Sequence, residues 1–215
     1  MERDLIANKV RQWCAHFDSA HDMAHLFRVA ERSVEIGRIE YPELNPTLIW
    51  IAGLLHDVCD KKMTPSEQDR TSRRQEVADL LAGLSFNASD VALIMESIDK
   101  CGFRKSVARR EVNEIVNNPI LSCVQDADLI DAVGAVGIAR AFSFGGGLNR
   151  PMWDINEFEN PNSETSVGHF YDKLLIIPGY ASTATGRIEM EKRCDFMRMY
   201  LNQLHEEIVN VKINN

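Results

Sequence analysis

The stretch that most constrains the fold is LIWIAGLLHDVCDKK, residues 48–62. Its first part, Leu48–Leu55, is an apolar run without a charged side chain. A helix that is apolar on nearly all sides is central and buried. His56 and Asp57 follow directly, although removing an ionised carboxylate from water is costly unless a partner or a metal compensates. The sequence therefore predicts a buried helix followed by an aspartate that some neighbouring group holds.

Helical periodicity dominates the rest of the chain. From Met23, apolar residues recur at the spacing of one helix face, and YPELNP ends that helix. Amphipathic helices are expected in TPSEQDRTSRRQEVADLLAGL, in NASDVALIMESIDKC with an Asn or Ser cap, and in ATGRIEMEKRCDFMRMYLNQLHEEI. Residues 120–142 also have helical periodicity, and their Ala and Gly positions would allow close helix packing. Because no β-pattern competes, the sequence predicts an all-α fold.

The segment SFGGGLNRPMWDINEFENPNSETS is rich in Gly, Asn, Pro and Ser, and it predicts a long surface loop before the C-terminal helices. FGGGLNRP lacks the GK[ST] ending of a phosphate-binding P-loop. A chain of 215 residues with 45% hydrophobic composition suits one core. We expect a single domain over residues 1–215, with core motifs at about 18–142 and a C-terminal helical extension at about 165–212.

The formal net charge of −8 gives no reason to expect binding to a nucleic-acid polymer or an anionic membrane. Five widely spaced cysteines without a CxxC pair favour reduced thiols over a disulfide framework. The segment MERDLIANKV lacks the apolar core of a signal peptide, and no apolar run has the length of a membrane span. These features predict a cytoplasmic protein.

Two stretches carry histidines suited to metal binding. In HDMAHLFRV, the helical spacing places His21, His25 and Arg28 on one side of a helix, although a solvated face is the simpler interpretation. His56 and Asp57 together offer an imidazole nitrogen and a carboxylate oxygen, a mixed ligand set for a divalent metal. The alternative is a core histidine that is hydrogen-bonded to its neighbour.

The acidic run QDADLID places three carboxylates in an otherwise small and apolar helix. Asp128 and Asp131 lie three residues apart on one helical face, whereas Asp126 points elsewhere. A solvent-exposed helix face explains this arrangement poorly. The alternative is a capped helix start at Asp126 or Asp128.

Taken in order, HDMAHLFRV, GLLHDV, VQDADLIDAVGAVGIARAF and HFYDKLL resemble the motifs of the HD superfamily of metal-dependent phosphohydrolases. The resemblance covers nearly the full chain from about residue 18, and it is closest to a branch of small, stand-alone HD hydrolases, some of which act on nucleoside triphosphates. It implies a single HD-domain helical bundle. The implied metal ligands are His25, His56, Asp57 and Asp128, with motif alignment selecting Asp128 over Asp126. SIDKCGFRKSVARREVNEI matches the branch only loosely, which leaves the substrate open.

HD proteins with two metals add histidines between the HD pair and the last aspartate. No histidine occurs here between Asp57 and Asp128, so the resemblance implies one metal ion and not two. A mixed nitrogen and oxygen ligand set with open positions suits Mn, Mg, Co or Ni. A metal-bound water of lowered pKa could attack phosphorus. The resemblance thus implies hydrolysis of a small phosphorylated substrate, with a nucleotide as the favoured class.

Further site residues follow from the same resemblance. The catalytic candidates are Asp57, His21 and Asp60. His21 would face the substrate or a metal-bound water. Asp60 would orient a ligand or a water, and Asp131 and Gln125 could do the same. The substrate-binding candidates are Arg28, Lys61, Arg104 and Lys173, each with a plain structural or surface role as the alternative. Lys62, Lys105 and Arg140 are weaker candidates, and His169 is expected to be structural.

Two other functional classes stay open. The first is a nucleotide-binding or sensor module without turnover, which calorimetry without product formation would identify. The second is an HD-type di-iron oxygenase, which two metal ions per chain would identify. Oligomeric state is equally open from the sequence.

Overall fold

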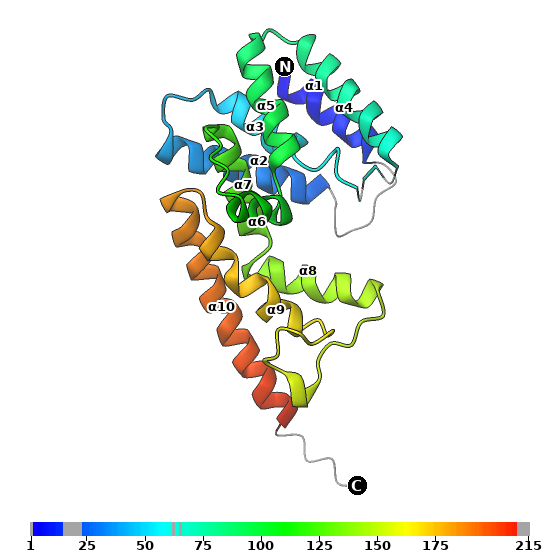
Figure 1. Ribbon diagram of the computed structural model, residues 1–215, viewed down its shortest axis with the longest axis vertical. Coiled ribbons are helices and arrows are strands. Elements are labelled where there is room, and N and C mark those ends of the chain that lie inside the picture. The colour runs from blue at the N-terminus through cyan, green and yellow to red at the C-terminus, as the bar shows by residue number, and fades with distance from the viewer. Residues whose placement is uncertain (1, 15–22, 62, 65, 210–215) are drawn as a thin grey trace. The chain divides into compact units, whose positions relative to one another are not determined.

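The structure is a computed structural model that describes residues 2–14, 23–61, 63–64 and 66–209 (Figure 1). Within these ranges, all the regular elements are helices and no strand occurs. The all-α prediction is therefore confirmed. His21 and Lys62 lie outside the described residues.

The chain divides into two compact units, each described by itself below. Unit 1 comprises Met1–Asp128 and Ser182–Thr185, and unit 2 comprises Leu129–Ala181 and Gly186–Asn215. The single domain over residues 1–215 stays a prediction, because compactness alone does not show whether the two units fold separately.

Six helices and most of a seventh form unit 1. They are α1 Glu2–Trp13, α2 Met23–Glu40, α3 Pro46–Leu55, α4 Glu67–Ala82, α5 Ala88–Lys100, α6 Phe103–Glu111 and α7 Pro119–Asp131. Side-chain oxygens cap three of these helices, since Asn45, Ser66 and Asn87 accept from backbone N–H groups of the first turn. The caps agree with the predicted helix starts, whereas α1 and α6 were not predicted.

Helix α3 is the buried centre of unit 1. Every residue from Leu48 to Leu55 is buried, as the apolar run predicts. A Cβ atom on Gly53 would lie 2.8 Å from the backbone Cα of Ala30 in α2. The two helices therefore approach as closely as they do because Gly53 has no side chain.

A second set of contacts anchors α7 within unit 1. Asp126 is fully buried, and its carboxylate accepts from Ser182 N at 2.8 Å, Thr183 N at 2.8 Å and Thr183 Oγ1 at 2.7 Å. Glu40 at the end of α2 accepts from Thr185 N at 2.6 Å. Asp126 thus binds the backbone at the start of α10 (Ala184–Val209) instead of capping its own helix.

The stretch 120–142 is helical, as its periodicity predicts, but it forms two helices. Helix α7 ends at Asp131, and α8 runs from Gly134 to Gly147. Gly134 has φ +77°, a left-handed conformation that interrupts a right-handed helix and favours glycine. The predicted loop also begins later than expected, because α8 continues through the three consecutive glycines.

Unit 2 contains α8, η1 Ile155–Glu157, α9 Gly168–Asp172, η2 Leu174–Tyr180 and most of α10. Phe170 of α9 and Met190, Cys194 and Met197 of α10 are fully buried and form core packing, whereas Met199 is exposed. Arg140, a weaker substrate-binding candidate, donates to Asp131 at 2.6 Å. No single helix in the described chain is long and apolar enough to cross a membrane, and only α7 and α8 taken together reach that length and composition.

Candidate metal centre

Three segments of unit 1 bring two histidines and two carboxylates together. His25 comes from α2, His56 and Asp57 follow α3, and Asp128 lies in α7. The histidines are 1% and 3% exposed, whereas the side chains of Asp57 and Asp128 are 24% and 22% exposed. The cluster is therefore buried on the imidazole side and accessible on the carboxylate side.

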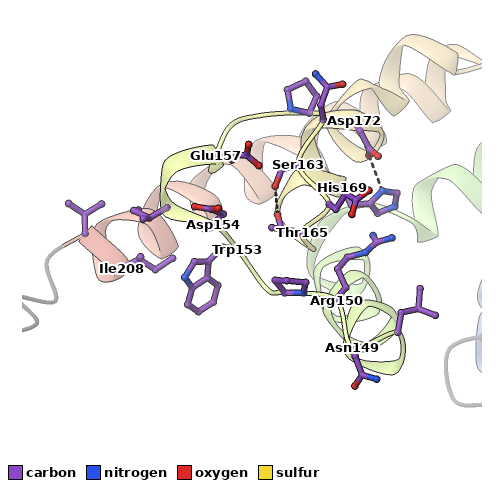
Figure 2. Close-up of a pocket in the computed structure, with 17 residues that line it drawn as sticks. Asn149, Arg150, Trp153, Asp154, Glu157, Ser163, Thr165, His169, Asp172 and Ile208 are labelled. Atoms are coloured by element: carbon purple, nitrogen blue, oxygen red, sulfur yellow. Dashed lines mark hydrogen bonds and ion pairs between the residues drawn. The ribbon is translucent and has the colours of Figure 1, made fainter.

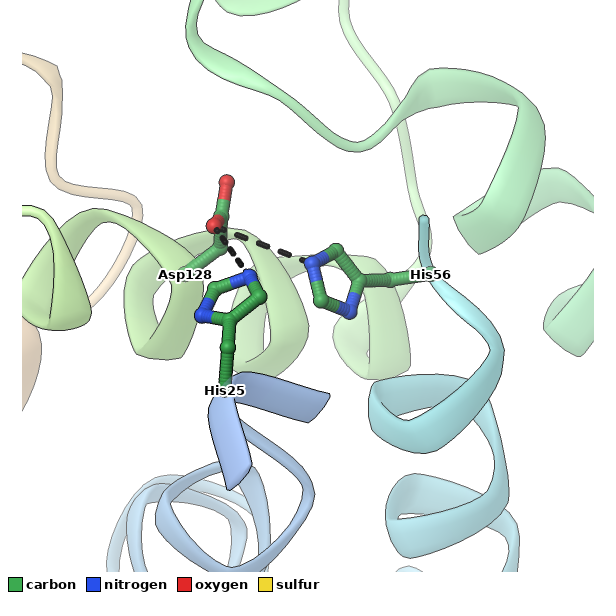
Figure 3. Close-up of side chains that lie close together, drawn as sticks. All are labelled: His25, His56 and Asp128. Atoms are coloured by element: carbon green, nitrogen blue, oxygen red, sulfur yellow. Dashed lines mark ion pairs between the residues drawn. The ribbon is translucent and has the colours of Figure 1, made fainter. Parts of the chain in front are cut away.

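The facing atoms are separated by similar distances. Figure 3 shows His25 and His56 facing Asp128, and His25 Nε2 lies 3.7 Å from Asp128 Oδ1. The same nitrogen lies 3.8 Å from Asp57 Oδ2. His56 Nε2 lies 3.7 Å from Asp128 Oδ1 and 3.6 Å from Asp57 Oδ2. These separations exceed a hydrogen bond, yet they fit ligand atoms that surround one ion with bonds of about 2.0–2.2 Å.

The backbone of α3 fixes the tautomer of His56. Its Nδ1 lies 2.7 Å from the carbonyl oxygen of Gly53, which can only accept, so Nδ1 carries the hydrogen. The neutral ring therefore has its lone pair on Nε2. That atom is buried and has no hydrogen-bond partner among the described residues. Metal-ligating histidines almost always donate one ring N–H to a carbonyl, carboxylate or water and bind the ion through the other nitrogen, and His56 has this arrangement.

Electrostatics at the cluster favour positive charge. Burial alone lowers the pKa of His56, but the negative charges of Asp57 and Asp128 and the bond to Gly53 outweigh it and raise the pKa to about 9. The two carboxylates thus attract a cation to this place, either a proton on His56 or a metal ion.

The same geometry decides among the simpler interpretations. His25 is buried, so its face of α2 is not a solvated face, although Arg28 on that face is exposed. His56 bonds Gly53 and not its neighbour Asp57. Asp126 and Asp128 both lie inside α7 and not at a capped start. The role of Gly53 has no sequence signal, because a backbone carbonyl acts and not a side chain.

The remaining candidate residues are more widely distributed. Asp60 lies in the turn after Asp57, and its carbonyl oxygen accepts from Met63 N and Thr64 N at 2.9 Å each. Lys61 and Arg104 are exposed residues of unit 1. Lys173 is half-buried and belongs to unit 2.

A separate cavity of about 1340 Å³ lies in unit 2, lined by residues of the 148–172 region and the end of α10 (Figure 2). None of its lining residues belongs to the metal cluster. His169 faces Asp172 there, with His169 Nδ1 at 2.8 Å from Asp172 Oδ1. Burial lowers the pKa of His169 although Asp172 opposes this change. His169 is thus paired with Asp172 within its own helix.

Comparison with known proteins agrees with these features. The family model described as HD domain matches residues 23–135, the range that contains His25, His56, Asp57 and Asp128. The uncharacterized protein YpgQ of Bacillus subtilis is 29% identical over 212 residues, which are 95% of each chain.

Solved structures extend the similarity to the fold. The crystal structure of B. subtilis YpgQ in complex with ADP is 30% identical, with a TM-score of 0.73 over 96% of this chain and 100% of that one. A Bacillus thuringiensis HD-superfamily hydrolase is 28% identical, with a TM-score of 0.75 over 98% of this chain and 100% of that one. The similarity therefore spans nearly the full length of each protein.

Proposed function

The chain belongs to the HD domain family of helical hydrolases, and we propose that it is a divalent-metal-dependent phosphohydrolase that acts on a nucleotide. The proposed ligands are His25, His56, Asp57 and Asp128. The observation that carries the proposal is the buried Nε2 of His56, which has no hydrogen-bond partner within the described part of the chain and faces two carboxylate oxygens at 3.6 and 3.7 Å.

The donor set fits an ion such as Mn²⁺, Co²⁺, Ni²⁺ or Mg²⁺, because it mixes imidazole nitrogen with carboxylate oxygen. A divalent ion held there supplies a bound water of lowered pKa and neutralises charge on a phosphoryl oxygen. Gly53 keeps the lone pair of His56 on Nε2 through its carbonyl oxygen. The partial exposure of Asp57 and Asp128 leaves their side of the cluster open to a substrate.

Other residues take the roles that the family resemblance implies. Asp60 would orient a water or ligand from the turn after Asp57, and His21 would face the same space. Arg28 lies one helical turn after His25 and is exposed, so it would bind a substrate phosphate. The same role is proposed for Lys61, Arg104 and Lys173.

Two observations support the proposed substrate class and the proposed location. A similar protein, YpgQ, forms a complex with ADP, which favours a nucleotide as the substrate class. All five cysteines of this chain are free thiols, which favours a reducing, cytoplasmic location.

The test is turnover by the purified protein, loaded in turn with each of the four ions and offered a panel of nucleotides and sugar phosphates. Product masses separate release of pyrophosphate from release of phosphate. Asp57→Ala should abolish turnover while circular dichroism shows an intact fold. Asp79→Ala, which changes an exposed aspartate of α4, should leave turnover unchanged. Absence of turnover with every ion and substrate would refute the proposal.

A further inference from the structure

The cavity of unit 2 has a volume of about 1340 Å³, and no residue of the metal centre lines it (Figure 2). Its lining residues all belong to unit 2 and lie beyond residue 135, where the match to the HD family model ends. Ligand pockets measure about 300–1,000 Å³, so this volume admits a small molecule together with water. The chemistry of the lining indicates which kind of molecule that is.

The loop that forms much of the cavity wall is held at its ends and in its middle. Residues 166 and 167 donate backbone hydrogen bonds of 2.9 Å to the carbonyl oxygens of residues 151 and 152. Between these ends, Phe158 is buried, and its ring packs on His205 of α10 with 4.8 Å between the ring centroids. The wall is therefore formed before a ligand arrives, which lowers the entropic cost of binding.

The charged side chains of the cavity are mostly acidic. Among the described lining residues, four carboxylates face one guanidinium, that of Arg150, which gives a formal charge of −3; the acids are Asp154, Glu157, Glu164 and Asp172. Burial lowers the pKa of His169 below its usual 6.5 although Asp172 opposes this change, so the ring is neutral at pH 7. The lining therefore favours a ligand that carries positive charge.

Two of these acids already have partners, and two are left for a ligand. Asp172 pairs with His169, and Asp154 Oδ1 accepts from Asn156 N at 2.9 Å. Glu157 and Glu164 are exposed, and neither forms an ion pair with a described residue. Two separate carboxylates of this kind suit a ligand with two ammonium groups.

Trp153 adds an aromatic surface to the acidic lining. Its side chain is partly exposed, whereas Trp13 and Trp50 are buried in unit 1. The face of an indole ring attracts ammonium groups, and its area also contacts the methylene groups that carry them. An organic cation with an apolar body therefore fits this side of the cavity better than an inorganic ion does.

Arg150 is kept apart from the acids. Its side chain forms no ion pair within the described part of the chain, although four carboxylates line the same cavity. It lies close enough to His169 to lower the pKa of that ring, and Figure 2 shows its side chain directed toward His169. The cavity thus offers one cation for an acidic group of the ligand.

A hydroxyl pair, Ser163 and Thr165, supplies a further donor. Both residues line the cavity and are more than nine-tenths buried. Ser163 Oγ donates to Thr165 Oγ1 at 3.1 Å, and Thr165 Oγ1 also accepts from Gly168 N at 2.9 Å. This arrangement uses one of the two hydroxyl hydrogens, and the other has no acceptor among the described residues. Because a buried donor without an acceptor is costly, the hydroxyl pair suits an oxygen atom of a ligand.

We propose that this cavity is a second ligand site, which binds a basic amino acid. The two ammonium groups of the ligand bind Glu157 and Glu164, with its methylene chain over Trp153. Its carboxylate binds Arg150 and the free hydrogen of the hydroxyl pair. The inference does not rest on the proposed function, because no residue of the metal centre takes part.

Calorimetry with the full chain in a buffer that contains Mg²⁺ tests the inference with two probes, L-lysine and cadaverine. Cadaverine is lysine without the carboxylate, so the comparison isolates what Arg150 and the hydroxyl pair contribute. L-lysine should bind about tenfold more tightly. Binding should also change the tryptophan emission, and Trp153→Phe should remove this change because Trp13 and Trp50 lie in unit 1.

Three variants assign the contacts. Arg150→Gln should weaken binding of L-lysine about tenfold and change the cadaverine Kd less than about twofold. Glu157→Gln should weaken both probes about threefold, because both lose one exposed ion pair. Arg38→Gln is the control, since Arg38 is exposed on α2 of unit 1, and it should leave both Kd values unchanged. Circular dichroism checks that each variant keeps the fold.

The outcomes separate this inference from the proposed hydrolysis. Absence of heat and of a change in emission with both probes at millimolar concentration overturns the inference. Equal affinity for the two probes, or an equal loss for both in Arg150→Gln, overturns it as well, because the guanidinium then binds no carboxylate. The predicted order of affinities supports the inference even if no nucleotide is hydrolysed, a result that would refute the proposed function alone.

Discussion

His56 Nδ1 donates to the carbonyl oxygen of Gly53 at 2.7 Å, so the backbone of α3 determines which ring nitrogen faces Asp57 and Asp128. The buried helix α3 therefore also sets the orientation of a proposed metal ligand, His56.

Metal binding should depend on pH through His56. Its pKa of about 9 means that the metal-free site holds a proton at neutral pH, and a metal must displace that proton. The metal affinity should rise about tenfold per pH unit below pH 9 and then level off. Calorimetry at pH 7.5 in buffers of different ionisation enthalpy should show release of close to one proton per ion bound.

The metal-free protein should respond to pH in the opposite sense. The pKa of His56 is raised in the folded state above its usual 6.5, so its contribution to stability is complete below pH 6.5 and is lost as pH rises through about 9. The free energy of unfolding of the chelator-treated protein should therefore fall between pH 6.5 and 9. A constant value over that window, measured with urea, would contradict the electrostatic description of the cluster.

Asp126 and Asp128 should separate structure from metal binding. Asp128→Asn removes a carboxylate from the cluster and should lower metal affinity at least about a hundredfold while the fold persists. Asp126→Asn keeps the metal but weakens the bonds from Ser182 and Thr183, so unfolding should become easier by about 1–3 kcal/mol. Metal titration and denaturant unfolding of both variants check this, and the reverse pattern would make Asp126 the ligand.

Gly53→Ala should disturb the fold and the site together. The added methyl group meets the backbone of Ala30 at 2.8 Å, so α2 and α3 must move apart. Overpacking of this kind costs about 1–3 kcal/mol. Because His25 and His56 come from these two helices, metal affinity should also fall. Gly83→Ala is a control, since its nearest contacts lie at 3.5 Å or more, and thermal unfolding with and without metal compares the two.

Two glycines of α8 should respond oppositely to alanine. Gly134 has φ +77°, so Gly134→Ala should cost about 1–2 kcal/mol. Gly146 lies within the helix with no atom within 4 Å of an added Cβ, so Gly146→Ala should stabilise by about 0.4–1 kcal/mol. Denaturant unfolding of the two variants tests both the helix break and the helical state of the glycine run.

The sequence predicts the helices that have strong apolar periodicity or clear caps, such as α3 and α5. The sequence does not predict helix boundaries that depend on the backbone conformation of a glycine. Gly134 interrupts the stretch 120–142, although a glycine in a helical pattern is equally compatible with continuation. The glycines at the end of α8 remain helical, against their low propensity, because Gly145 is packed on Ser166.

The site also has features that the sequence predicts and features that it does not. The resemblance of the motifs to the HD superfamily selects His25, His56 and Asp128, and the structure brings a ligand atom of each within 4.8 Å of the others. The ring orientation of His56 could not be predicted, since it depends on the carbonyl oxygen of Gly53. The hydrogen bonds that Asp126 accepts from Ser182 and Thr183 could not be predicted either, because these partners lie 56 and 57 residues away in sequence.

The hydrogen bonds to Asp126 and Glu40 also affect the order in which the chain can fold during synthesis. His25, His56, Asp57 and Asp128 all leave the ribosome before Thr183 and Thr185, which bind Asp126 and Glu40 across 57 and 145 residues. Until they arrive, α7 carries a carboxylate with no backbone partner and cannot be buried cheaply. The nascent chain therefore possesses every proposed ligand well before the segment that binds Asp126 and Glu40 is synthesised.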